Sequence, residues 1–426
     1  MSAGQWPIQL QPRTTYLSLH AWTQFAFHVT FTTSSVYAIV EVGLNPFQLL
    51  LVGAVLEGSV LITEVPTGIV ADAFSRRRSV IIGYAILAIG FLVWASVPNL
   101  WMILIAQVFW ALGFTFTSGA QEAWIADEVG DDSVGAVFLR SAQIGQLAAF
   151  LGIFVGVSLA IVDLQIPFFV SGILFLFLSG FLFVFMAERN FKPAGSVDGV
   201  FGGIKVTLRS SASAIRGRAA IVFTLAVVAI FGASYEAFDR LWPAHLLQQV
   251  NLPELAGLDP LVWFAVIASG GLLLGAGITG VVGKTGAVTT RTGPTRTLAV
   301  LTALLTVTLF AFAFTSSLLA LVITYWVVVA LHHSSRPVVL TWINRGLDPS
   351  VRATVISMHS QGDSLGQVTF GPVIGIIATI RSIRFGLAVG ATALVPALCL
   401  LVLAGRRDSK LSQELSEGPV SAETPD

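Results

Sequence analysis

Long apolar runs alternate with short breaks rich in Gly, Pro or charge along almost the whole chain. A helix that crosses the hydrocarbon core of a bilayer needs about 20 consecutive, mostly apolar residues. Runs of this length predict roughly twelve membrane-spanning helices. Their expected limits are 16–40, 47–71, 79–97, 100–124, 135–161, 166–187, 219–248, 260–285, 297–315, 318–343, 353–379 and 384–404.

Composition supports this prediction. The chain has 426 residues, of which 55% are hydrophobic and 11% charged, and its mean hydropathy is +0.84. A soluble protein carries about 25% charged residues, so this chain lacks the side chains to cover a water-facing surface. An all-α polytopic membrane protein is expected, and a soluble enzyme, a disordered chain and a single-anchor receptor are excluded. The chain has 23 basic and 23 acidic residues, so it lacks the excess of positive charge that would indicate a nucleic-acid partner.

The positions of the cations predict the orientation. Of the 23 Lys and Arg, all but Arg240, Arg336, Arg381 and Arg384 fall on one side if both termini are cytoplasmic. Short cytoplasmic loops are enriched in Lys and Arg, so both ends are expected inside. The expected organisation is an N-terminal segment, a six-helix bundle, a cytoplasmic linker, a second six-helix bundle and a cytoplasmic tail. These parts correspond to residues 1–15, 16–187, 188–218, 219–404 and 405–426.

Short strings recur between the two predicted bundles. Trp124-Ile125 returns as Trp342-Ile343, and Gly145-Gln146 returns as Gly366-Gln367. An Asp-x-Ser-Val-x-Ala string begins at Asp131 and recurs at a nearly identical offset. All three matches lie around the connection between the fourth and fifth spans of each half. They indicate an ancient duplication, and two repeats around a central site are a transporter architecture.

One loop carries a recognisable motif. Gly68 and Asp72 close the second span, and the run Arg76, Arg77 and Arg78 opens the third. This segment resembles the signature loop of the major facilitator superfamily (MFS), G-x-x-x-D-[RK]-x-G-R-R-[RK]. The resemblance implies the MFS fold, with twelve helices in two pseudo-symmetric six-helix bundles and both termini cytoplasmic. It also implies transport by alternating access.

The resemblance further implies a conformational latch. In the family, the loop aspartate and arginine join an acidic residue at the cytoplasmic end of span four and hold the outward-open state. Asp127 occupies that place, so Asp72, Arg76 and Asp127 are the expected latch. Gly68 is expected to allow close approach of a neighbouring helix. The alternative is that the arginine run only fixes the topology.

Two other family motifs are weakened. An arginine that is associated with proton coupling in many members is replaced by Gln107, and span five lacks the proline found in many drug exporters. Even so, relatives that share this loop and its E-V-P-T-G entry are mostly exporters. Proton-coupled efflux of amphipathic compounds or drugs is therefore the leading hypothesis, and uptake of a small metabolite by symport is the alternative.

Span seven holds the densest group of charges at membrane depth. Glu236 and Arg240 are four residues apart and share a helix face, whereas Asp239 points about 100° away from Arg240. The E-x-x-D-R-L-W string around them resembles one in bacterial MFS members. Ionisable groups inside a membrane are costly, so they usually pair and mark a functional path. The group is expected to act in coupling or gating, or to serve as a structural ion pair near the outer end.

Further candidates lie in spans two, four, ten and eleven. Arg336 in span ten is expected to pair with a carboxylate or an anionic solute, because its guanidinium stays charged. The carboxylates considered as its partners are Glu122 and Asp363, and Glu57 and Glu122 are candidate proton carriers. His332 beside Arg336 is a candidate for the lining of the solute path, but its neighbour His333 points elsewhere, so no metal site is expected.

No nucleotide-binding, metalloprotease or nucleophile-elbow motif occurs in the sequence. No cofactor or catalytic residue is expected, and a membrane-embedded enzyme or sensor is a remote alternative. The expected partners are a small-molecule solute, protons and the lipid bilayer, with the protein acting as a monomer. Because none of its asparagines begins an N-x-Ser/Thr sequon, a bacterial inner membrane is the expected location.

Overall fold

The computed structural model describes residues 9–193, 219–284, 293–344 and 349–416. Within those ranges the regular elements are helices. The N-terminal half contains α1 (Pro12–Val36), the π-helical turn η1 (Tyr37–Glu41), α2 (Pro46–Ala73), α3 (Arg76–Trp94), α4 (Leu100–Thr117), α5 (Ala120–Val129), α6 (Asp131–Val162) and α7 (Ile166–Phe185). The C-terminal half contains α9 (Ala219–Gln249), α10 (Val262–Lys284), α11 (Gly293–Phe314), α12 (Leu318–Asn344), α13 (Pro349–Ile380) and α14 (Ile383–Ser416).

Taken as one span, α4 and α5 bring the number of spans to twelve, as predicted. Among the described residues, nine helices are long and apolar enough to cross a membrane by length and composition. Local sequence explains several helix starts. Asn45 and Gln48 form a reciprocal capping box at α2, and the side chains of Ser75 and Asn99 accept from the third backbone N–H of α3 and α4.

The two halves repeat one packing arrangement. In the N-terminal half α6 packs against α1, where a Cβ added at Gly156 would lie 2.2 Å from the Val29 carbonyl oxygen. In the C-terminal half α13 packs against α9, where a Cβ at Gly366 would lie 1.9 Å from the Ala229 carbonyl oxygen. Only glycine permits such backbone approach between helices. The equivalent helix pairs agree with the predicted duplication.

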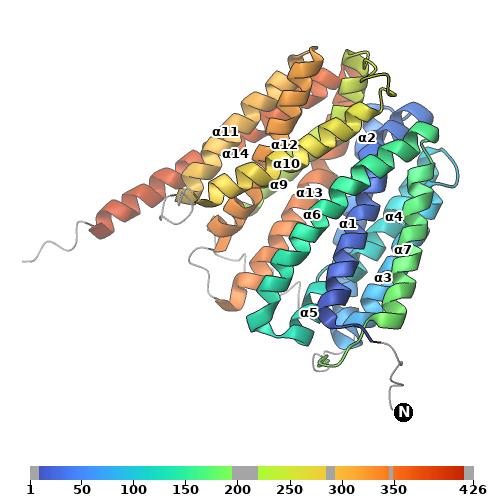
Figure 1. Ribbon diagram of the computed structural model, residues 1–426. Helices are drawn as coiled ribbons and strands as arrows, with labels where there is room; N and C mark the ends of the chain where they lie inside the picture. The colour runs from blue at the N-terminus through green and yellow to red at the C-terminus, as the bar shows by residue number, and fades with distance from the viewer. Residues whose placement is uncertain (1–8, 194–218, 285–292, 345–348, 417–426) are drawn as a thin grey trace, which may run out of the picture.

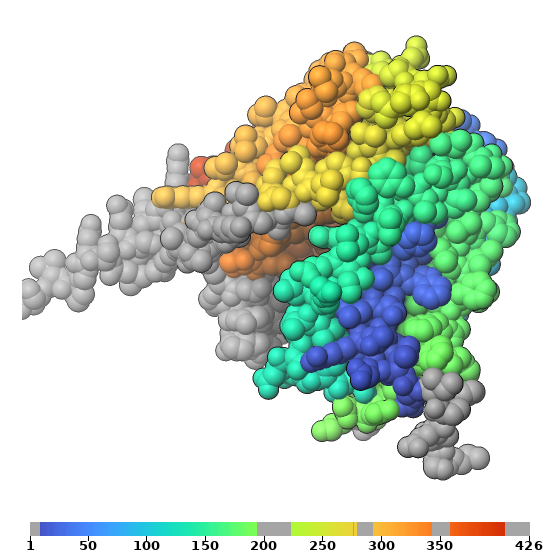
Figure 2. Space-filling model, in the orientation of Figure 1, coloured from blue at the N-terminus to red at the C-terminus, as the bar shows by residue number. Residues whose placement is uncertain are grey.

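The halves meet at one end and separate at the other. Figure 1 shows the two bundles together near the top of the view and diverging toward the end where the N-terminus lies. At the closed end the Phe47 backbone N–H of α2 donates to Thr379 Oγ1 of α13 at 2.9 Å. Figure 2 shows α6 (teal) against α10 (yellow), where Ile153 and Val157 form an apolar cluster with Ala265. By the predicted orientation, the open end faces the cytoplasm.

Two boundaries differ from the expected ones. Span four was expected to be continuous over 100–124, but it breaks between α4 and α5 because Ser118 is extended and Gly119 has φ +75°. The last span was expected to end at residue 404. Its apolar part does end at Ala404, whereas the helix continues to Ser416. Most of the expected linker 188–218 lies outside the described residues.

Candidate functional site

An ion pair of α9 lies against the opposite half. Arg240 Nε donates to Glu236 Oε1 at 2.8 Å, the pairing expected from their four-residue spacing. The Glu236 side chain is 6% exposed and that of Arg240 is 22% exposed, so Glu236 is the more buried partner. Gly53 of α2 makes room for the pair, because a Cβ there would lie 1.6 Å from Glu236 Oε1.

A second carboxylate lies beside this pair and joins the halves directly. Glu57 is one helical turn from Gly53 on α2, and its Oε2 accepts a hydrogen bond from Ser364 Oγ of α13. The two residues are 307 positions apart in sequence. The charges of Glu236 and Arg240 also act on Glu57. We call Gly53, Glu57, Glu236, Arg240 and Ser364 the interface cluster.

The interface cluster contains more acid than base. Two carboxylates, Glu57 and Glu236, share one guanidinium, and only Glu236 is in direct contact with it. Carboxylates that share a site with too few cations do not both ionise freely, so such a group is suited to holding a proton. The cluster lies at the contact between α2, α9 and α13, where the two halves meet.

Asp239 takes no part in the ion pair of the interface cluster. It is exposed and forms no ion pair within 4.0 Å to a described residue, although it is adjacent in sequence to Arg240. Its charge acts on Tyr235 and Tyr325, which places the carboxylate beside the aromatic side chains between α9 and α12. An unpaired carboxylate at this depth is suited to contact with solvent or solute.

Span ten differs from the expectation. Arg336 is exposed and has no carboxylate within 4.0 Å among the described residues, so the close ion pair expected for it is not formed. Asp363 Oδ2 instead accepts from Gln367 Nε2 at 2.9 Å, one turn along its own helix. His332 stacks on Tyr235 with ring centroids 3.5 Å apart, and His333 is turned away by an interplanar angle of 87°.

The expected latch contacts are present in the N-terminal half. Arg76 Nη1 donates to Asp127 Oδ2 and, at 3.0 Å, to the Ala123 carbonyl oxygen. Asp72 is a weaker partner, because its side chain is 58% exposed and lies 3.5 Å from Arg76 Nε. These contacts join α2, α3 and α5 of one half. In this conformation they do not by themselves hold the two halves together.

The other motif residues have different contacts. Arg77 donates to the carbonyl oxygens of Met186 and Phe183, both at 2.5 Å, and so satisfies the C-terminal end of α7. Arg78 is exposed and contributes its backbone N–H to the Ser75 cap. The close helix approach expected at Gly68 is wrong for this conformation, since a Cβ there would meet no described atom within 4 Å.

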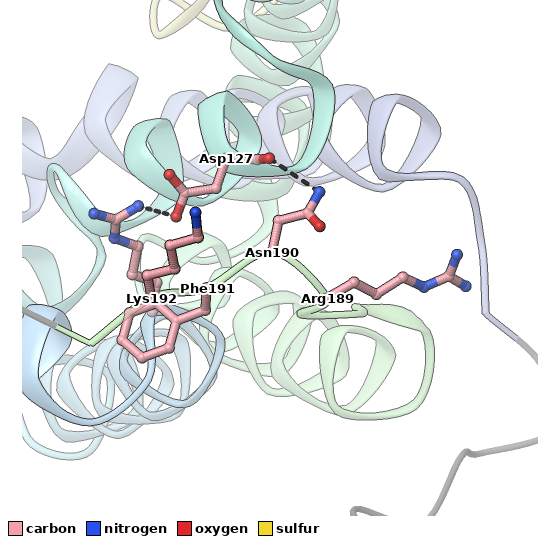
Figure 3. A pocket seen from close by; sticks show the side chains of 6 residues that line it. Asp127, Arg189, Asn190, Phe191 and Lys192 are labelled. Carbon is pink, nitrogen blue, oxygen red and sulfur yellow. Dashed lines mark hydrogen bonds and ion pairs between the residues drawn. The ribbon is translucent and has the colours of Figure 1, made fainter.

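A pocket of about 490 Å³ lies beside the latch at the open end. Figure 3 shows Asp127 beside Asn190, whose side-chain amide donates to the Asp127 backbone carbonyl oxygen at 3.1 Å. The Asp127 carboxylate accepts from Arg76 on its other side. The chain after α7 is fastened here by two acids. Glu188 accepts from Ser75 Oγ and the Arg77 backbone N–H. Glu128 accepts from the backbone N–H groups of Arg189 and Asn190. This pocket is an anchoring region apart from the interface cluster.

Glu122 has a local role in the structure. Its carboxylate accepts from the Gly119 backbone N–H at 3.1 Å and from Gln121 Nε2 at 3.0 Å, so it caps α5 after the break. It forms no ion pair with Arg336. Gln107, which replaces the arginine of many relatives, is buried with its Nε2 unbonded in the part of the chain that the structure describes.

Sequence reasoning missed Gly53, Ser364 and Glu188. A serine within an apolar span, next to Asp363, was a weak signal for Ser364. Gly53 lies one turn from Glu57, and a glycine on the same helix face as a carboxylate was a weak signal for close approach of another helix. Nothing in a single sequence places Gly53 against α9 or pairs Ser364 with α2.

Comparison with known proteins identifies the family. The sequence profile of the Major Facilitator Superfamily matches residues 19–331. The chain is 22% identical over 389 residues to an uncharacterized MFS-type transporter, YxaM, of Bacillus subtilis (strain 168), and the match covers 87% of this chain and 90% of the relative.

Solved structures share the fold. A nucleoside transporter, NupG, superposes with a TM-score of 0.76 at 15% identity, covering 92% of this chain and 99% of that one. A peptide transporter, POT, in complex with sulfate superposes with a TM-score of 0.74 at 15% identity, covering 94% and 95%. At these identities the likeness extends to the fold alone. The chain therefore belongs to the Major Facilitator Superfamily and is a multi-pass membrane transporter, not an enzyme.

Proposed function

We propose that this chain is a proton-coupled secondary active transporter of small organic solutes, working as a monomer in a bacterial inner membrane. The observation that carries the proposal is the hydrogen bond from Ser364 of α13 to Glu57 of α2. It places an ionisable group on the surface along which the two halves must separate. A solute path that opens alternately to either side requires that separation.

Proton binding at Glu57 has different consequences in the two conformations. In the state described here, Glu57 is half-buried, is bonded to Ser364 of α13 and is acted on by the charges of Glu236 and Arg240. Separation of α2 from α13 at the closed end would remove both the Ser364 bond and the neighbouring charges. A ligand shifts a conformational equilibrium only by binding two states unequally, and a proton at Glu57 meets that condition.

The direction that we propose is export by antiport. It is supported by the resemblance of the Gly68–Arg78 loop and its E-V-P-T-G entry to those of exporters. Uptake by symport is the second candidate, favoured by Gln107 in place of an arginine and by the lack of a proline in α6. The solute that we propose for export is an amphipathic organic compound, and nucleosides and peptides, for which the structural neighbours are named, are further candidates to be tested.

The latch belongs to this proposal. Arg76, Asp72 and Asp127 fix the open-end corner of α2, α3 and α5 within the N-terminal half. We propose that this corner receives the C-terminal half when the cytoplasmic end closes, so that the latch contributes to the outward-open state.

Purified protein in phospholipid vesicles with an imposed pH gradient tests the function. Radiolabelled nucleosides, dipeptides, sugars, small organic acids and cationic dyes would be followed in gradients of both signs. We expect at least one class to move only when the gradient is present and to move protons measurably with a trapped pH dye. Equal movement with and without the gradient for every transported class would contradict proton coupling.

A further inference from the structure

Arg336 lies on the surface of the C-terminal half that faces the N-terminal half. Its charge acts on Tyr235 of α9 and on His359 and Asp363 of α13, so the guanidinium lies among α9, α12 and α13. The charge of Asp363 in turn acts on Glu57 in the N-terminal half. The Arg336 side chain is exposed, and its neighbours α9 and α13 are the helices that contact α2 of the N-terminal half. We infer that it faces the opposite half and not the core of its own bundle.

No described carboxylate lies within 4.0 Å of Arg336. Asp363, on which its charge acts, forms its hydrogen bond with Gln367. Asp239 lies on the other side of the stacked Tyr235 and His332 rings, because α9 and α12 run in opposite directions. Each charge is four residues, or about 6 Å of helix, from its ring, so the two are about 12 Å apart along the bundle.

Apart from Asp363, the described neighbours of Arg336 are aromatic and imidazole side chains, which carry no negative charge. His332, His333 and His359 are its other titratable neighbours, and each is an electrostatic neighbour of the guanidinium. Nδ1 of His332 is buried with no hydrogen-bond partner among the described residues. A guanidinium offers a fork of donors that matches the two oxygens of a carboxylate or phosphate. Uncompensated charge at membrane depth otherwise carries a large desolvation cost.

We propose that Arg336 is the anchor of a binding site for the oxyanion, carboxylate or phosphate, of a small organic solute that enters from the open end. This inference rests on the proposed transport function and names the chemical class of its solute. The guanidinium binds the oxyanion, the unbonded His332 nitrogen lies one turn deeper, and the Tyr235–His332 rings form the wall above the anion.

A charge series on one ring tests the site directly. Purified protein would be placed in nanodiscs of phosphatidylcholine, which carry no anionic lipid, and its thermal unfolding followed. The probes are benzoate, phenyl phosphate, neutral benzamide and cationic benzylammonium. We expect saturable stabilisation by benzoate, phenyl phosphate or both, and none by benzamide or benzylammonium at the same concentrations. Equal effects of charged and neutral probes would overturn the proposal.

Three variants locate the effect. Arg336→Gln should weaken the apparent affinity for the stabilising anion by about tenfold or more, and Arg336→Lys should retain part of it, because the charge is kept and the fork is lost. Arg140→Gln is the control, since Arg140 is exposed on α6 and bonded only to Gln143 in the described residues. If Arg336→Gln does not fold, Arg336→Lys and the charge series on the unaltered protein decide the question. Undiminished anion binding in both Arg336 variants would refute the assignment.

Discs that contain phosphatidylglycerol separate a solute from a lipid headgroup. Stabilisation by that lipid, with no effect of the soluble anions, would overturn the solute assignment. Failure of this inference is distinguishable from failure of proton coupling. Binding is measured without a gradient, and the vesicle experiment measures coupling for every solute class whether or not Arg336 binds an anion.

Discussion

Helix contacts inside each half differ from those between the halves. Inside the halves, backbone meets backbone: a Cβ at Gly156 or Gly366 would lie about 2 Å from a carbonyl oxygen of the neighbouring helix, at 2.2 and 1.9 Å. Between the halves, the glycine that lies closest to the opposite half faces a side chain and not the backbone. A Cβ at Gly53 would meet Glu236 Oε1, and the closest backbone approach, from Gly375 to Phe47 Cα, is looser at 2.9 Å.

This difference indicates which contacts can break. Interlocked backbones cannot slide or separate without unfolding the pair, because close-packed interiors are not continuously deformable. Side-chain hydrogen bonds such as Ser364 to Glu57 can exchange for water at a modest net cost. We therefore expect the halves to move as rigid units, and we propose that the interface cluster is the contact that separates between them.

The largest expected effect comes from filling an interlocked contact. Gly366→Val should prevent α13 from packing on α9. The expected loss of stability is larger than the usual cost of overpacking, which is about 1–3 kcal/mol. The yield of monodisperse protein in detergent and its melting temperature are the readouts. Gly180→Val is the control, because a Cβ there would meet no described atom within 4 Å. Similar melting temperatures for the two variants would remove the distinction between the contact types.

A smaller effect, on conformation more than on folding, is expected at the interface. Gly53→Ala places a methyl group against the Glu236–Arg240 pair, so either the pair or the approach of α2 must give way. We expect a shift toward states in which the closed end is open. Gly58→Ala is the matched control on the same helix, where the nearest atom of the opposite half would lie at 3.9 Å.

Spin labels read out this shift. Glu41 and Arg381 are exposed at the closed end, one on each half, and the single native Cys399 can be replaced by serine. The distance distribution between labels at the two positions should gain a longer component in Gly53→Ala and stay unchanged in Gly58→Ala. A longer component in both variants, or in neither, would show that the methyl group does not act through the ion pair.

The smallest effects are expected at the latch, which lies inside one half. Asp127→Asn should lower the melting temperature more than Asp72→Asn, because Asp127 is the closer and less exposed partner of Arg76. A partly exposed pair contributes about 1 kcal/mol or less. Asp72→Asn should still reduce transport with nearly normal expression, if the corner receives the C-terminal half in the opposite conformation. Full transport activity in Asp72→Asn would contradict the latch proposal.

Much of the fold was predictable because membrane spans are specified locally. Each helix must satisfy its backbone internally and be apolar over its length, so twelve spans can be read from hydropathy. The break at Gly119 was not predictable, because glycine is also common in membrane helices that are unbroken. The extension of α14 to Ser416 lies in a polar segment where hydropathy carries no signal for a helix.

The site was predictable only where its partners are close in sequence or belong to a motif. The Glu236–Arg240 pair follows from helical spacing, and Asp127 was placed beside Arg76 by the family resemblance. The bond between Glu57 and Ser364 depends on how two whole bundles meet. Arg336 has no carboxylate within 4.0 Å among the described residues, and Asp363 accepts a hydrogen bond from Gln367. Sequence spacing alone does not show which of these two partners Asp363 contacts.

We propose that Glu57 couples a proton to separation of the halves. Its most direct test compares Glu57→Gln with Glu64→Gln, a control on the same helix whose carboxyl group has no described hydrogen bond. Solute exchange without a gradient and transport driven by a pH gradient would be measured in the same vesicles. We expect Glu57→Gln to keep exchange and to lose pH-driven transport, and Glu64→Gln to keep both. Retained pH-driven transport in Glu57→Gln would contradict this role of Glu57.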